Sequence, residues 1–347
     1  DEAFRNCTAA EIYYPSGCTL GTNTFDNAVA AIEYTVTDGS TALRLTASNG
    51  VGITIPETIG GGTVKSLQND LRPGLSIAHA GAHHYVDGTC SICGKPQGDV
   101  VEISPENFPD GIFRSYVSDF DTDRDGGLSQ DEIRGVTLIK VDGKGISSLQ
   151  GIEFFTALEE LSFVGNSIET LDISKNTELE LIYGDDNRLT TLDVSRNTKL
   201  TKLFLQENPV QSLDVSDCSL LEVLWLSDAP IKELDVSRNL LLNYLSMYYC
   251  GLEAIDLSNN QELKWLGLDG NALSELDVTQ NSGLLSLSCE ENSLTSLDVS
   301  QNPLLETLYC SKNQITELNL QNNPELTTLW CSENKLTGLD VTPCKEL

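Results

Sequence analysis

Hydrophobic residues recur along the C-terminal half of the chain with a period much longer than that of a helix or a strand. The tetrad Leu-Asp-Ile-Ser that begins at Leu171 returns at Leu192 and then at every further step of 21 residues. The later copies begin at Leu213, Leu234, Ile255, Leu276, Leu297, Leu318 and Leu339. A fixed period of this length indicates an array of structural repeats, each of which buries its apolar side against the next.

A second phrase lies between the tetrads and alternates apolar and polar positions. The copy from Leu326 to Leu336 reads L-x-x-L-x-C-x-x-N-x-L, which matches the leucine-rich-repeat pattern L-x-x-L-x-L-x-x-N-x-L. Its centre predicts a short strand whose side chains point alternately inward and outward, and stacked copies predict a parallel sheet. We therefore expect nine leucine-rich repeats over residues 149–347, forming a curved solenoid of strand and coil.

Two asparagine positions recur in the repeats. We expect the side chain at the first position to turn the chain and to bond the backbone of the adjacent coil. This column contains Asn166, Asn187, Asn208, Asn271, Asn292, Asn313 and Asn334. The second column follows the tetrads and contains Asn176, Asn197, Asn239, Asn260, Asn281, Asn302 and Asn323.

Six cysteines fall within the same frame. Cys289, Cys310 and Cys331 occupy an inward strand position, and other repeats place Leu226, Met247 and Leu268 there. Cys218, Cys250 and Cys344 occupy asparagine positions. We expect buried, reduced thiols that act as small hydrophobic side chains, with disulfides as the alternative. A catalytic cysteine is not expected, because the repeats contain no histidine to activate one.

The 21-residue unit, with its Leu-Asp-Val-Ser tetrad and inward cysteine, resembles the internalin-like repeats of Gram-positive surface proteins. Internalins are adhesins. The resemblance therefore implies a secreted or cell-surface protein of a Gram-positive bacterium that recognises another surface.

Residues 100–148 contain an EF-hand pattern. The segment Asp121–Glu132 reads D-x-D-x-D-G-x-x-x-x-x-E, in which Gly126 permits the sharp turn. The expected calcium ligands are Asp121, Asp123, Asp125, Gly127, Ser129 and Glu132. Apolar residues at helical spacing lie before the loop (Ile112, Phe113, Tyr116, Val117 and Phe120), and a short helix is expected after it through Ile133 and Val136.

We interpret this segment as a small helical cap that calcium stabilises and that seals the open end of the solenoid. The pattern holds a single loop, so Leu128 has no sister loop with which to pair. The segment resembles the cap of repeat proteins from gut Firmicutes.

Residues 1–70 resemble a BspA-like leucine-rich repeat. The resemblance rests on the phrase Ala3-Phe4-Arg5-Asn6-Cys7 and on the I-x-x-P phrase that ends at Pro15. Alternating apolar residues independently predict short strands here, for example over 32–36 and 51–55. We expect a β-rich region that forms the tail of a longer repeat array.

Residues 71–99 are expected to be a linker that contains a His/Cys knuckle. All three histidines of the chain lie here, and a C-x-x-C-G phrase follows them. Four side chains have spacing suited to a zinc site: His79, His83, Cys90 and Cys93. A small disulfide or free thiols are the alternative.

The outward strand positions carry large aromatic residues, including all three tryptophans of the chain. Because tryptophan and tyrosine are frequent anchors of binding sites, we expect a ligand-binding face on the concave sheet. Its residues are Tyr183, Phe204, Trp225, Tyr244, Tyr248, Trp265, Tyr309 and Trp330. Two alternatives remain: the rings only stiffen the sheet, or the tetrads form the concave strands and place the column that begins at Asp172 outward.

The charge and the motifs narrow the class of function. The chain has 347 residues and a formal net charge of −31, which disfavours nucleic acid and anionic membranes as partners. It has no apolar run long enough to span a membrane, and no catalytic set or nucleotide-binding fingerprint. We expect a monomeric binding module, not an enzyme, that recognises a protein or a glycan. The alternative is a structural stalk that displays another domain.

Overall fold

The computed structural model describes residues 100–347 in full and, before them, the backbone of nine short strands. The chain forms two compact units. The first contains Asp1–Asn107 and Arg114–Ile133, and the second contains Phe108–Phe113 and Arg134–Leu347. No helix among the described residues is long and apolar enough to cross a membrane.

The strands before residue 100 confirm that this region is rich in β-structure. Their bounds are β1 Glu11–Pro15, β2 Ala30–Thr37, β3 Ser40–Ser48, β4 Ile53–Ile55, β5 Thr58–Ile59, β6 Gly62–Leu67, β7 Ile77–His79, β8 Tyr85–Val86 and β9 Thr89–Cys90. Five of them form a mixed sheet in the order β1-β2-β3-β6-β5. The side chains of this region, and the whole of His83 and Cys93, lie outside the described residues, so the zinc site and the BspA-like assignment stay predictions.

Short elements surround the predicted calcium loop. They are β10 (Val100–Glu102), α1 (Gly111–Val117), the 3-10 turn η1 (Ser118–Phe120), β11 (Gly127–Ser129) and α2 (Gln130–Arg134). The helix before the loop is confirmed. The helix after it ends at Arg134, so the prediction that it runs through Val136 is wrong. The chain must leave the helix there because β12, which joins the sheet of the repeats, begins at Leu138.

The first turn of α1 is fixed to the start of the repeats. Asp110 caps the helix, since one of its carboxylate oxygens accepts the backbone N–H of Phe113 at 3.1 Å. Its other oxygen accepts the N–H and the hydroxyl of Ser147 at 2.9 and 3.0 Å. The fully buried ring of Phe108 lies 6.4 Å from that of Phe155, centroid to centroid. Aromatic side chains of this segment therefore cover the apolar start of the solenoid.

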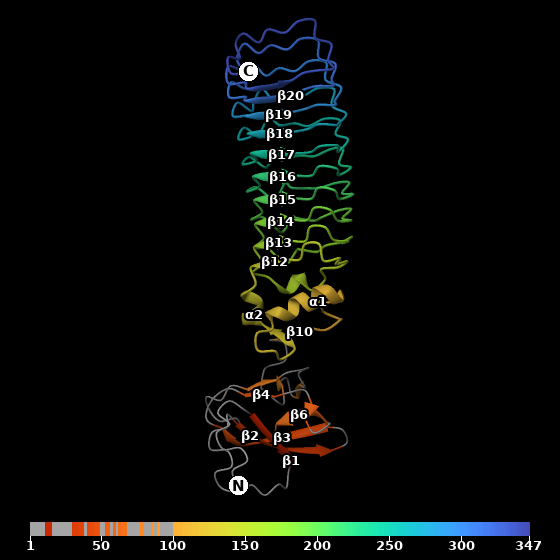
Figure 1. The fold of residues 1–347 in the computed structure, drawn as a ribbon, viewed down its shortest axis with the longest axis vertical. Coiled ribbons are helices and arrows are strands. Elements are labelled where there is room, and N and C mark those ends of the chain that lie inside the picture. Colours follow the sequence, from red (N-terminus) through yellow and green to blue (C-terminus); the bar gives the residue numbers. More distant parts are fainter. Residues whose placement is uncertain are drawn as a thin grey trace. The chain divides into compact units, whose positions relative to one another are not determined.

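The repeats form a ten-stranded parallel sheet, shown as the column of stacked arrows in Figure 1. A 3-10 turn, η2 (Ile152–Phe154), lies between the first two strands. The strands are β12 Leu138–Lys140, β13 Glu160–Ser162, β14 Leu181–Tyr183, β15 Lys202–Phe204, β16 Val223–Trp225, β17 Tyr244–Ser246, β18 Trp265–Gly267, β19 Ser286–Ser288, β20 Thr307–Tyr309 and β21 Thr328–Trp330. The solenoid architecture is confirmed. Its sheet begins with β12, before residue 149.

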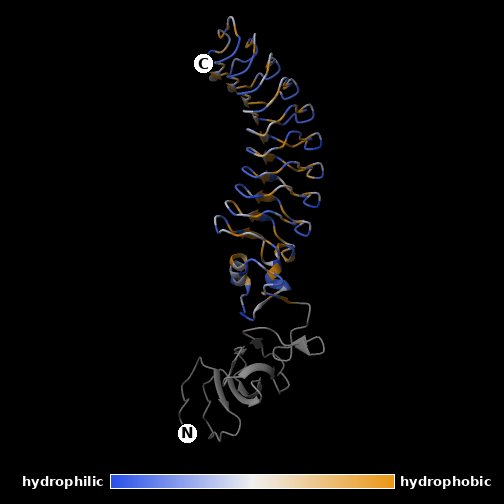
Figure 2. Cartoon of the chain, turned by 90° about the vertical axis from the view of Figure 1, so that its right-hand side faces the viewer, coloured by the Kyte–Doolittle hydropathy of each residue, from blue (hydrophilic) through white to orange (hydrophobic). Residues whose placement is uncertain are grey.

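The core consists of the inward positions of successive coils. Figure 2 shows hydrophobic residues recurring at the same place in each coil of the stack. The central strand residues, such as Leu203, Leu224 and Leu245, are fully buried. Each strand residue pairs with the residue 21 positions later in the next strand, for example Leu203 with Leu224. Equivalent positions of the repeats therefore lie side by side along the sheet.

Asparagine side chains join each coil to the one before it. The amide nitrogen of Asn208 donates to the carbonyl of Gly184 at 2.9 Å, and its oxygen accepts the N–H of Leu189 at 3.0 Å. In the second column, Asn239 donates to the carbonyls of Val215 and Cys218 at 2.9 and 2.8 Å. The predicted role of the first column is confirmed. The second column bonds the preceding coils only through the N–H groups that it donates, because its buried amide oxygens accept no hydrogen bond.

Candidate functional site

The structure resolves which part of the repeat forms the exposed sheet. The strands are the segments of the repeat that contain Tyr183, Phe204 and Trp225. These three residues pair in register across β14, β15 and β16. The tetrads lie outside the strands. Their aspartates close local turns; for example, Asp193 accepts the N–H of Ser195 at 2.9 Å. The outward columns are therefore the variable, aromatic ones, and the alternative phase is wrong.

Five rings form an unbroken run across five neighbouring strands. Tyr183 stacks on Phe204 at 4.9 Å between ring centroids, and Tyr244 stacks on Trp265 at 4.2 Å with an interplanar angle of 4°. Trp225 joins the two pairs, at 6.2 Å from Phe204 and 5.7 Å from Tyr244. We call these five residues together with Tyr248, which meets Trp265 at 5.9 Å, the aromatic strip. Six of the eight residues of the predicted face therefore form one contiguous patch.

The other two predicted aromatic residues form a separate cluster. Tyr309 and Trp330 meet edge to face at 4.8 Å. Between this cluster and the aromatic strip lies β19, whose outward residues are Ser286 and Ser288. Tyr309 and Trp330 therefore occupy the same outward column of the sheet as the strip, as expected. The serines of β19, however, separate their rings from the rings of the strip.

The rings of the aromatic strip are half-buried, because they cover one another. Their outward strand positions would suggest rings that lie in water and contribute little to the fold, but all six residues are only partly exposed. Trp225 is also fixed by its indole N–H, which donates to the hydroxyl of Ser227 at 2.9 Å. Only Trp330 is largely exposed, at 58%. Removing a ring from the strip therefore removes ring–ring contacts as well as a surface group.

Carboxylates follow the strands on one side of the strip, and two of them bond the neighbouring coil. Asp185 accepts the N–H of Gln206 at 2.9 Å. Asp269 accepts the hydroxyl of Ser288 at 2.6 Å and the N–H of Glu290 at 2.7 Å. Burial raises the pKa of Asp185 and of Asp269, although these hydrogen bonds oppose the rise.

The two columns that follow strands β14–β21 hold eight acidic residues. We call them the acidic edge: Asp185, Asp186, Glu207, Asp228, Asp269, Glu290, Glu291 and Glu333. The single basic residue in these columns is Lys312, whose ammonium group forms an ion pair with Glu291. The acidic edge is therefore almost uncompensated by this part of the chain.

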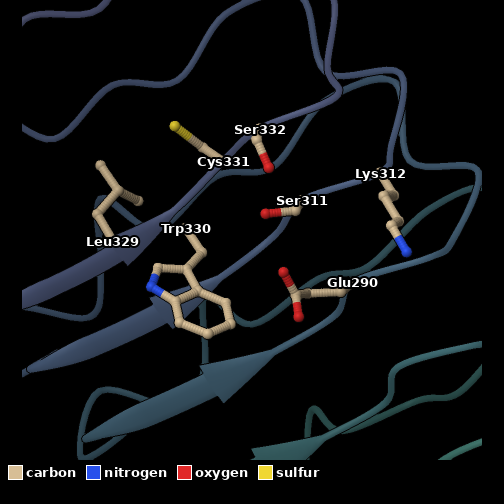
Figure 3. A pocket seen from close by; sticks show the side chains of 7 residues that line it. All are labelled: Glu290, Ser311, Lys312, Leu329, Trp330, Cys331 and Ser332. Atoms are coloured by element: carbon tan, nitrogen blue, oxygen red, sulfur yellow. The ribbon is translucent and has the colours of Figure 1, made fainter.

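An open pocket of about 710 Å³ lies at the last strand, beside the second aromatic cluster. Figure 3 shows the ring of Trp330 and the carboxylate of Glu290 next to each other, with Ser311 above them and Lys312 to the right. The pocket places an accessible carboxylate next to an exposed indole.

The calcium loop is a second candidate site, in the first compact unit. Asp121, Asp123 and Glu132 each have a carboxylate oxygen within 4.8 Å of the others. Gly126 has a φ of 88°, the left-handed conformation that the sharp turn requires. The predicted ligand that supplies a hydroxyl, Ser129, donates to a carboxylate oxygen of Glu132 at 2.8 Å.

The residues of this loop fit a calcium ion. Asp121 accepts the N–H groups of Asp125 and Gly126 at 3.1 and 2.9 Å, so the loop is already closed around its carboxylates. Burial and the charge of Asp125 raise the pKa of Asp121. A divalent cation would relieve this repulsion and supply the positive charge that converging carboxylates lack.

The strand of the loop has a partner that the sequence did not indicate. Residues Gly127–Ser129 pair antiparallel with β10, and Leu128 lies opposite Val101. A sister loop is therefore not needed to complete the backbone hydrogen bonds of β11.

The inward cysteines form the expected ladder. Cys289 and Cys310 are fully buried, and burial raises the pKa of Cys310 to about 12 and the pKa of Cys289 well above its ordinary value. Cys331 is only partly buried. Among the described strands, β21 pairs on one side only, with β20, so the expectation of full burial holds for two of the three thiols.

Solved structures with the same arrangement identify the class of solenoid. The functional domain of InlJ from Listeria monocytogenes, described as including a cysteine ladder, matches 72% of this chain with 35% identical residues and a TM-score of 0.68. The chain has an internalin-like leucine-rich-repeat fold. It spans 56% of the InlJ domain that it matches.

A second internalin gives a weaker match. InlF from Listeria monocytogenes aligns over 71% of this chain and 95% of its own, with 21% identical residues and a TM-score of 0.44. Comparison with protein-family models and with curated proteins finds no match.

Proposed function

We propose that this chain is a secreted or cell-surface binding module that recognises a protein partner through the aromatic strip. The observation that supports this proposal most strongly is the unbroken run of rings from Tyr183 to Trp265 on the outward side of the sheet. Large apolar surfaces of this kind favour association, and aromatic residues dominate the energy of many interfaces. The similarity to InlJ, an internalin, is consistent with such a role.

The orientation of the rings favours a protein over a glycan. A sugar ring stacks on the flat face of an aromatic side chain. In the pairs Tyr183–Phe204 and Tyr244–Trp265 the faces cover each other, with interplanar angles of 16° and 4°. The partner therefore meets mainly ring edges, which pack well against aliphatic, aromatic and carbonyl groups of a protein.

A structural stalk is the competing function, and the same ring contacts favour it. Rings that stack across strands stabilise a sheet even without a ligand. The two functions differ in what truncation of a ring changes: binding and stability together for the module, stability alone for the stalk.

The test begins with protein and glycan arrays probed with the full chain in the presence of calcium. Candidate partners are then measured against Trp265→Ala and Phe204→Ala, with Leu241→Ala as a matched control. Leu241 is exposed on a turn and lies outside the strip. A partner that binds through the strip should lose at least about tenfold in affinity with each aromatic variant and remain unaffected by the control. Retained affinity in variants that melt earlier would show that the partner binds outside the strip. Arrays without any partner, together with aromatic variants that melt earlier, would favour the stalk, and hits confined to glycans would overturn the choice of a protein.

We extend this proposal to the loop Asp121–Glu132 as a structural calcium site. Asp121, Asp123, Asp125, Ser129 and Glu132 would supply side-chain oxygens, and Gly127 its carbonyl. Bound calcium would stabilise the segment that precedes the repeats.

A further inference from the structure

The last ring of the aromatic strip has one covered face and one face without a neighbouring ring. Tyr244 lies parallel to Trp265 at 4.2 Å and covers the first face. On the other side, the register places Ser286 of β19 beside Trp265. A serine side chain is too short to cover an indole, so β19 supplies no ring to this face of Trp265.

Tyr248 borders the open face without closing it. A side chain at Gly267 would collide with Cη2 of Trp265 at 2.4 Å and with Cζ of Tyr248 at 2.7 Å. The indole therefore meets Tyr248 with its edge, in agreement with the interplanar angle of 87°. Glycine at this position is what lets the two rings lean over the strand.

The opposite border is Tyr309 on β20. The register aligns Gly267, Ser288 and Tyr309 across β18, β19 and β20. Because β18 and β20 are two strand spacings apart, about 9.6 Å, the gap between their rings has room for one flat or compact group. Ser286 and Ser288 form its floor.

The charged residues that follow the two strands at this gap are negative. Asp269 and Glu290 follow β18 and β19. Burial raises the pKa of Tyr248, and the charges of these two carboxylates raise it further. Asp269 accepts hydrogen bonds from Ser288 and from the backbone N–H of Glu290. Glu290 also lines the separate open pocket beside Trp330 (Figure 3), so its carboxylate is accessible from that side. The basic residue closest in sequence on this edge, Lys312, is engaged by Glu291.

From this juxtaposition we infer that the gap at β19 is a subsite for a basic side chain, lysine or arginine, presented by the protein partner. Trp265, Tyr248 and Tyr309 would border the cation, and Glu290 would pair with it. Aromatic faces attract cations, and a carboxylate beside them adds to the attraction. The inference rests on the proposed binding function and specifies the chemistry of the partner: a positively charged protein surface.

The three tryptophans allow a direct test with small probes. The indole N–H signals of the ¹⁵N-labelled full chain are recorded during titration with N-acetyl-arginine amide, N-acetyl-lysine amide and the neutral isostere N-acetyl-citrulline amide. Trp265→Phe identifies the signal of Trp265. We expect the two cations to shift that signal with saturation, and citrulline to leave it in place. An equal response to citrulline, no response to either cation, or a shift confined to Trp330 would overturn the subsite.

A pair of charge variants adds an independent readout. Glu290→Gln should weaken binding of the arginine probe about fivefold, as expected for loss of a charge partner at close range in water. Glu291→Gln is the matched control, because Glu291 is paired with Lys312 and should leave the titration unchanged. Equal effects of both variants would show a general response to net charge and would contradict a local subsite.

These probes separate the subsite from the binding function. If the array partners lose affinity with Phe204→Ala but the cations do not shift Trp265, the binding module stands and the subsite is wrong. If the cations shift Trp265 but no partner depends on the strip, the subsite exists and the proposed function fails.

Discussion

The ring of Phe163 occupies the space in which a side chain at Gly184 would lie. A Cβ atom at Gly184 would come within 2.5 Å of Cζ of Phe163 and 3.1 Å of a methyl group of Leu205. Phe163 and Gly184 belong to the same inward column, which holds cysteine or a larger apolar side chain in the other coils. The large ring of Phe163 therefore fills the space that the missing side chain of Gly184 leaves in the next coil.

The substitution Gly184→Ala should therefore destabilise the solenoid. Overpacking of a dense core costs about 1–3 kcal/mol, which urea denaturation would detect as a lower midpoint. Gly338→Ala is the control, since a Cβ there meets no atom within 4 Å. The double variant Phe163→Leu with Gly184→Ala should recover part of the loss. Equal stability of the Gly184 and Gly338 variants would contradict this packing.

Replacement of Cys218 by asparagine should stabilise the fold. The sulfur atom of Cys218 lies 3.7 Å from the carbonyl oxygens of Val194 and of Asn197, so both contacts are weak hydrogen bonds. The amide of Asn239 meets the equivalent carbonyls of the next coil at 2.9 and 2.8 Å. An asparagine in this frame should gain about 1 kcal/mol, seen as a higher denaturation midpoint. Cys289 lies at an apolar inward position, so we expect Cys289→Asn to lower the denaturation midpoint.

The stability of the repeats should fall with rising pH above about 9. Burial raises the pKa of Cys218 to about 12 and that of Cys250 to about 11, from an ordinary value of 9.0. Below that value both folded and unfolded chains hold the thiol protons, and stability does not change. Above it the unfolded chain releases them while the folded chain keeps them, so the free energy of unfolding declines. Urea midpoints at pH 8, 9 and 10 measure the decline, and Cys218→Asn should flatten it; an unchanged slope would contradict the burial of this thiol.

Calcium should bind the loop at Asp121 and raise the stability of the segment that contains it. At a free concentration 100-fold above Kd, the gain is about 2.7 kcal/mol. Calorimetric titration of the metal-stripped chain measures the binding, and melting with and without chelator measures the stabilisation. The double variant Asp121→Ala, Glu132→Ala should abolish both effects. Asp119→Asn, an acidic neighbour just before the loop, should leave them intact; melting that EDTA does not alter in the parent would rule out a calcium site.

The repeat pattern made most of the solenoid predictable. A strict step of 21 residues with an L-x-L centre determines which side chains face inward, because a shift of one residue would expose every leucine. The outward position of Trp225 and the coil-to-coil bonds of Asn208 followed from that frame. The helix before the calcium loop followed from apolar spacing of the helical kind.

Other features depend on contacts that no local pattern encodes. The pairing of Leu128 with Val101 joins segments 27 residues apart, and no sequence motif indicates it. The half-buried state of Trp265 arises because Gly267 admits its ring and Tyr248 turns back toward it. A left-handed backbone recurs once per coil, at Glu207 and Lys312 among others, with φ of 53° and 56°. Glycine occupies this position only at Gly165 and Gly270, so the composition of the repeats gave no sign of it.

The asparagine bonds also define the unit by which this surface could change length. Each amide reaches a carbonyl 24 residues earlier, as from Asn208 to Gly184 and from Asn239 to Val215. Deletion or duplication of one whole coil would therefore restore every such bond with a new neighbour, whereas a change of any other length would break them. Loss of the coil that contains Phe204, for example, would bring Trp225 beside Tyr183 in an intact sheet. A recombining gene could in this way lengthen, shorten or reorder the recognition surface while the scaffold that supports it keeps its phase.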